Sequence, residues 1–90
     1  MKTAQEFRKI AIKKMSTPDM VEAAKLIETL IFDAINKGKN YISLNTGYAT
    51  YRDLCDLTKG YDNLKTYLEL HGYTVSTSYF DDSSFFTVSF

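Results

Sequence analysis

Few residues in this 90-residue chain are of types that do chemistry, and their spacing forms no catalytic motif. His71 is the only histidine, and it directly precedes Gly72 at the expected end of a helix. There an imidazole lies near the last carbonyl groups and the negative end of the helix dipole. A catalytic base also needs an aligned nucleophile or substrate group. We therefore interpret His71 as a helix-terminal side chain.

Metal and cofactor sites are not predicted either. Asp81 and Asp82 form an adjacent carboxylate pair, but they lack a nearby third ligand and an EF-hand register, so they are more typical of a turn. The single cysteine, Cys55, excludes an internal disulfide and a CxxC metal site, and we expect it to be a small buried residue on a helix. No P-loop or GxGxxG motif occurs. The sequence thus predicts no enzymatic activity, no metal and no cofactor.

The composition indicates one small globular domain. Hydrophobic residues make up 44% of the chain and aromatic residues 14%, which is too apolar for a disordered protein. Ninety residues suffice for a single core, so we expect one α+β domain over residues 1–90. No apolar run approaches the ~20 residues of a membrane span, and the first residues lack the apolar segment of a signal peptide. A cytosolic protein without membrane contact is expected.

A helix over residues 18–37 is expected to organise the domain. Ser16 or Thr17 can cap it, Pro18 suits its first position, and Gly38 ends it. Its apolar face covers about two thirds of the circumference, which is more than one neighbouring element can bury. We expect cover either from elements of the same chain on two sides or, in part, from another subunit.

The net charge of zero is unevenly distributed. Residues 1–17 hold five bases against one acid, a net charge of +4, and residues 18–90 carry the compensating −4. The spacing predicts a short amphipathic helix over residues 3–15, with Thr3 and Glu6 as a capping box. Its apolar face is expected to cover part of the central helix. The following bases are expected to stay in water, either as a contact surface for phosphate or acidic protein or simply as a solvated face: Arg8, Lys9, Lys13 and Lys14.

The middle of the chain reads as a strand and two helices. Tyr41 to Leu44 is a short strand, and Asn45-Thr46-Gly47 is a turn signal. Thr50 is expected to cap a helix over residues 51–58. After Lys59-Gly60, a further helix is expected over residues 61–71, which makes a tight helix-turn-helix.

The last residues predict a β-hairpin. Residues 73–79 and 86–90 alternate between apolar and polar side chains, as strands with one wet face do. We expect residues 81–84 to form a turn of about four residues between Phe80 and Phe85. Aromatic side chains fall on both faces of this ribbon, although only one face can rest on the core. Phe80 and Phe85 therefore either pair across the strands on the surface or anchor a protein partner, together with Asp81 and Asp82.

The expected order is helix, helix, strand, helix, helix, strand, strand. Without the first helix, this is the order of a winged-helix domain, with residues 61–71 as the recognition helix and the hairpin as the wing. DNA binding requires phosphate neutralisation by basic residues, but this helix has a net charge of −1 and the hairpin turn has two acids and no base. We therefore keep a winged-helix DNA-binding regulator as the alternative function.

Three segments resemble a widespread group of small bacteriophage proteins. They are Ile31 to Gly38 with the following strand, Leu64 to Val75 with its Gly-Tyr-x-Val pattern, and the terminal Phe86-Thr87-Val88-Ser89-Phe90. In that group the last strand has a Thr-Ile-Ser-Trp pattern, so this chain departs from it at Phe90 and by its basic first helix. The resemblance implies a phage accessory or virion-associated protein that acts through protein contacts, commonly as an oligomer.

These observations lead to one expected function. We expect a non-enzymatic phage module for protein binding or assembly, located in the cytoplasm of the bacterial host or in the virion. An inhibitor of a host factor would fit the same description. Its candidate contact residues are the hairpin tip and the basic side chains of the first helix.

Overall fold

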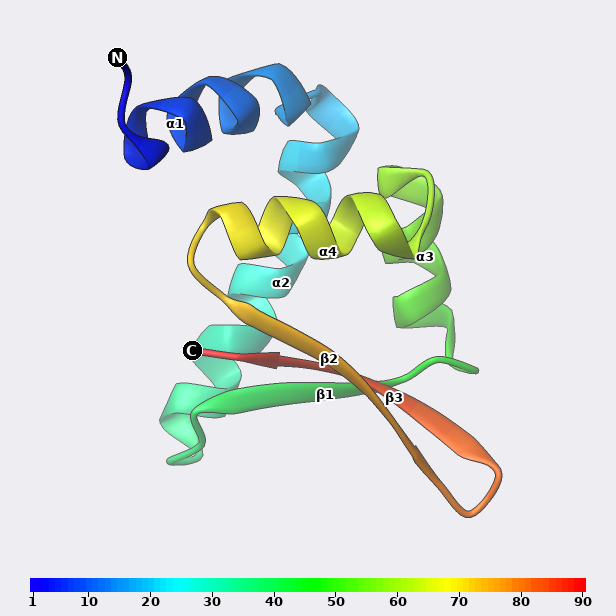
Figure 1. Cartoon of the computed structure of the whole chain (residues 1–90). Coiled ribbons are helices and arrows are strands. Elements are labelled where there is room, and N and C mark those ends of the chain that lie inside the picture. The colour runs from blue at the N-terminus through cyan, green and yellow to red at the C-terminus, as the bar shows by residue number, and fades with distance from the viewer.

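The computed structural model describes residues 1–90 as four helices and a three-stranded antiparallel sheet, an α+β domain (Figure 1). The elements follow the predicted order of two helices, one strand, two helices and two strands. Their bounds are α1 Ala4–Met15, α2 Pro18–Asn36, β1 Tyr41–Asn45, α3 Ala49–Thr58, α4 Tyr61–Leu70, β2 Thr74–Phe80 and β3 Ser83–Ser89.

Helix α2 begins and ends as its sequence predicts. The Thr17 hydroxyl accepts a hydrogen bond from the backbone N–H of Met20, and Pro18 occupies the first turn. After Lys37, Gly38 adopts a φ of +74°, and the N–H of Lys39 donates to the carbonyl of Ala34. Glycine suits this left-handed position because it has no Cβ. The helix is thus fixed at both ends by local chemistry.

The cover of α2 is one-sided. Met20, Ala23, Ile27, Ile31 and Ala34 are buried by the rest of the chain. Four apolar side chains of the same helix stay exposed: Val21, Leu26, Phe32 and Ile35. The chain therefore buries one broad face of α2 and leaves its flanks open, with Phe32 66% exposed.

Two helix predictions need correction. Helix α3 begins at Ala49 and not after Thr50, and its N-cap residue, Tyr48, makes no capping hydrogen bond with its side chain. Helix α1 was expected to cover α2, but it packs against α4. Its half-buried residues are Ala11, Ile12 and Met15, whereas Phe7 and Ile10 remain about half exposed. No residue of α1 is fully buried, so α1 packs on the surface of the domain and contributes no residue to its core.

The sheet has the strand order β1-β3-β2, with every neighbour antiparallel. Its inner face carries Ile42, Val75, Phe86 and Val88, which are all buried against the helices. Leu54 of α3 and the pair Leu64 and Leu68 of α4 complete this core with the buried face of α2. One contiguous core therefore joins the sheet to α2, α3 and α4.

Candidate interaction surfaces

The hairpin of β2 and β3 extends past the body of the domain (Figure 1). Strand β1 ends at Asn45, opposite Phe85, so the ribbon continues beyond this point with only two strands. On this extension the side chains of Tyr79 and Phe80 are 83% and 71% exposed. Tyr79 is the most exposed aromatic side chain of the protein and Phe80 is the next, and tyrosine is among the residues enriched at the centres of protein interfaces.

The turn of the hairpin is shorter than the sequence predicted. Phe80 pairs with Ser83, which leaves only Asp81 and Asp82 in the loop, and Ser83 and Ser84 belong to β3. Asp81 and Asp82 both have positive φ, 46° and 63°, as a two-residue type I′ turn requires. This turn follows the right-handed twist of the strands, and it holds both carboxylates at the extreme end of the ribbon.

Of the two alternatives for Phe80 and Phe85, the register rules out that they lie directly opposite each other across the strands. Phe85 lies opposite Ser78, and Phe80 lies opposite Ser83, so the two phenyl groups are diagonal neighbours on the outer face of the sheet. Phe85 is half-buried on the central strand, between Ser78 and Asn45. Phe80, Asp81 and Asp82 therefore form the exposed tip, and Phe85 belongs to its base.

Tyr79 is an exposed tip residue that sequence reasoning missed. Alternation placed it on the inner face with Val75 and Thr77, and that assignment of the face is correct. The helices, however, end before the strand does. Thr77 still reaches the body, where its hydroxyl donates to the hydroxyl of Tyr61 over 3.0 Å, but Tyr79 lies beyond it. We call Tyr79, Phe80, Asp81 and Asp82 the hairpin tip.

Helix α1 presents a second surface of opposite charge. As predicted, its four basic side chains are exposed: Arg8, Lys9, Lys13 and Lys14. None of them forms an ion pair; the only ion pair of the chain joins Lys37 to Asp33. Phe7, Ile10 and Lys14 are spaced i, i+3 and i+7, so they share one stripe of the helix. We call this stripe with Lys13 the α1 stripe.

Helix α4 carries acids where a recognition helix would carry bases. Its exposed side chains include Asp62, Thr66 and Glu69. The wing that would accompany it ends on Asp81 and Asp82. The net charge of α4 is −1, since Lys65 is its only base, and the turn has no base at all, so phosphate would meet net negative charge at both elements. The basic cluster of the chain lies on α1.

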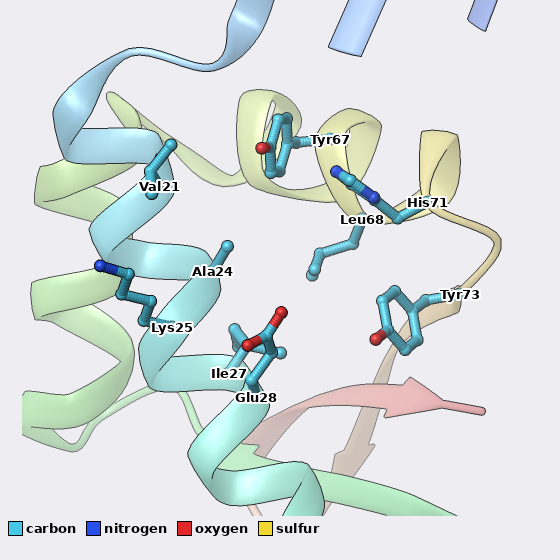
Figure 2. Close-up of a pocket in the computed structure, with 9 residues that line it drawn as sticks. All are labelled: Val21, Ala24, Lys25, Ile27, Glu28, Tyr67, Leu68, His71 and Tyr73. Atoms are coloured by element: carbon cyan, nitrogen blue, oxygen red, sulfur yellow. The ribbon is translucent and has the colours of Figure 1, made fainter. Parts of the chain in front are cut away.

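A shallow groove lies between α2 and α4 (Figure 2). It has a volume of about 250 Å³ and an apolar floor that includes Ala24, Ile27 and Leu68. Glu28, His71 and Tyr73 stand at its edge (Figure 2). The His71 ring packs edge-on against Tyr67, with 4.8 Å between centroids, and its nitrogens have no side-chain hydrogen-bond partner. The groove thus contains no base hydrogen-bonded to a nucleophile.

A cluster of aromatic rings, Tyr51 and Tyr61 around Phe86, lies inside the domain. The rings of Tyr51 and Tyr61 lie 5.5 Å and 5.9 Å from the Phe86 ring. Burial raises the pKa of the Tyr51 hydroxyl well above its ordinary value, and a hydrogen bond with the half-buried Cys55 raises it further. Tyr51 is therefore neutral at ordinary pH and serves packing. No three His, Cys, Asp or Glu side chains lie close enough together to hold a metal ion.

Comparison with known proteins gives no relative to guide the assignment. No protein-family model, no curated protein and no solved structure matches this chain. None of its helices combines the length and the apolar character that crossing a bilayer requires. The function has to be argued from the exposed surfaces themselves.

Proposed function

We propose that this chain is a non-enzymatic protein-binding or assembly module that contacts its partner through the hairpin tip. The observation that carries the proposal is the exposure of Tyr79 and Phe80 on a ribbon that the domain holds away from its core. The phage resemblance adds a setting, the bacterial cytoplasm or the virion. In that setting the partner is a virion protein, a host factor that the module inhibits, or a further copy of the chain itself.

The geometry supports binding because the tip is pre-organised. The two-residue turn and the register of β2 with β3 fix the backbone and the face of the ribbon from which each aromatic side chain projects before a partner arrives. The rings lie on opposite faces of the ribbon, so a cleft that received the ribbon would contact both. Asp81 and Asp82 add orientation toward a basic surface.

A photo-crosslinking amino acid in place of Phe80 tests this function. Expressed in a bacterial host, the chain is expected to give a discrete crosslinked product from position 80. The same amino acid at Thr66, exposed on α4, is the matched control and is expected to give none. Equal crosslinking from both positions would contradict a role of the tip.

Duplex DNA binding is the second candidate, because the element order from α2 onward, without α1, is that of a winged-helix domain. Under this alternative the α1 bases would have to supply the phosphate contacts. It predicts DNA binding that weakens steeply with salt and is lost on neutralising Lys9, Lys13 and Lys14. The acids on α4 and at the turn lead us to expect no such binding.

A further inference from the structure

Two of the surfaces that the chain leaves uncovered, the hairpin tip and the α1 stripe, complement each other in charge and in apolar character. We propose that a second copy of this chain is the partner of the hairpin tip, and that the tip of one protomer docks on the α1 stripe of the next. This inference rests on the proposed function, since it names the partner that the tip binds.

The surfaces cannot meet within one chain. The α1 helix and the hairpin turn lie at opposite ends of the molecule (Figure 1), whose longest dimension is 48 Å. Their charges consequently remain unpaired in the monomer. A contact between copies would bring Asp81 and Asp82 of one protomer close to Lys13 and Lys14 of another.

Apolar side chains accompany the charges at both ends. The tip offers Tyr79 and Phe80, and the α1 stripe offers Phe7 and Ile10, which are 55% and 47% exposed. A twelve-residue helix is marginal by itself in water, so α1 gains from any additional cover of this stripe. Docking would bury aromatic surface against aliphatic and aromatic surface, with the charges around it.

The signs of the charges favour a head-to-tail contact. A symmetric contact of α1 with α1 would bring two segments of net charge +4 together, and a contact of tip with tip would bring four carboxylates together. Only the contact of unlike ends pairs opposite charges. Each protomer contributes its hairpin tip to one contact and its α1 stripe to another. The contact therefore repeats and produces a ring or an open chain of subunits.

The accessible surface of the chain is large enough for contacts with further copies. Its accessible surface is 6338 Å², whereas a compact protein of 10.3 kDa exposes about 5,400 Å². The excess of about 900 Å² resembles what one partner contributes to a standard interface. The tip and the α1 stripe are each formed by a few side chains, so we expect a small contact and reversible assembly that depends on concentration and on salt.

A charge-swap experiment tests the inference by light scattering. Wild-type protein is expected to exceed 10.3 kDa at about 1 mM in low salt and to return to 10.3 kDa in high salt. The tip variant Asp81→Lys/Asp82→Lys and the α1 variant Lys13→Glu/Lys14→Glu are each expected to stay monomeric. Their equimolar mixture is expected to assemble again, because each swapped end then meets an end of opposite sign.

Two further variants keep this test independent of folding. Asp81→Asn/Asp82→Gly removes the tip charges with residues that favour the turn, and it is expected to remain folded and to lose assembly. Asp62→Lys/Glu69→Lys makes the same charge change as the tip swap on α4 and is expected to assemble like wild type. Circular dichroism verifies the fold of each variant.

Three results would overturn the head-to-tail contact: a monomeric wild type at about 1 mM in low salt, swapped variants that assemble alone like wild type, or a mixture that stays monomeric. If the mixture stays monomeric while position 80 still crosslinks specifically to another protein, the second-copy inference fails and the proposed function stands. If the mixture stays monomeric and position 80 gives no specific crosslink either, the proposed function fails as well.

Discussion

The hydroxyl oxygens of Ser16 and Tyr67 lie 3.0 Å apart, and this hydrogen bond joins the end of α1 to α4. Ser16 donates its own proton to the carbonyl of Ile12 over 2.6 Å, so the Tyr67 hydroxyl is the donor in the bond between them. Since α1 has no fully buried residue, this bond adds to the packing of the half-buried Ala11, Ile12 and Met15 in attaching the helix to the body.

Replacing Tyr67 with phenylalanine is therefore expected to loosen α1. The loss of one such bond lowers the free energy of unfolding by about 1 kcal/mol. Amide hydrogen exchange in α1 should accelerate, while exchange in the buried part of α2 changes only by the global loss of stability. Uniform acceleration over the whole chain would mean that the bond supports the core and not α1.

The variant Asp81→Asn/Asp82→Gly separates stability from binding at the hairpin. Asparagine and glycine adopt positive φ more easily than aspartate, so the free energy of unfolding is expected to rise by roughly 0.5 to 1 kcal/mol. Urea denaturation measures this change. A less stable variant would show that the carboxylates support the turn by interactions beyond its geometry.

Replacing Leu54 with alanine tests the extent of the core. Leu54 of α3 is 0% exposed within the core cluster, so its truncation leaves a cavity that only partly collapses. The expected loss is about 2 to 5 kcal/mol, a large part of the stability of a small domain. Thr50→Ala is the matched control on the same helix and is expected to cost little, because the Thr50 hydroxyl caps nothing.

The raised pKa of Tyr51 leads us to expect a loss of stability in alkaline solution. The unfolded chain releases the Tyr51 proton near pH 10, whereas burial and then the hydrogen bond with Cys55 raise the pKa of this hydroxyl in the folded chain. The contribution of the protonated Tyr51 to the free energy of unfolding is complete below about pH 10 and is lost as the pH rises above that value. Tyr51→Phe should therefore show a shallower fall in the free energy of unfolding between about pH 9 and 11. An identical slope in both proteins would contradict the assigned shift.

The sequence by itself determined the elements and most of their ends. Thr17, Pro18 and Gly38 define α2 through bonds and backbone preferences that lie within a few residues of each other. The alternation of β2 also gave the correct face for Tyr79. Such features are local, so they can be read from residue types and spacing.

Only the tertiary structure decided which of these faces are covered. Phe7 and Ile10 have the spacing of a packed face, but α1 turns other residues to α4 because its path is set by contacts far away in the sequence, such as Ser16 with Tyr67. Tyr79 alternates like a core residue, yet the helices end before it. Coverage depends on where distant elements stop, and no local pattern contains that information.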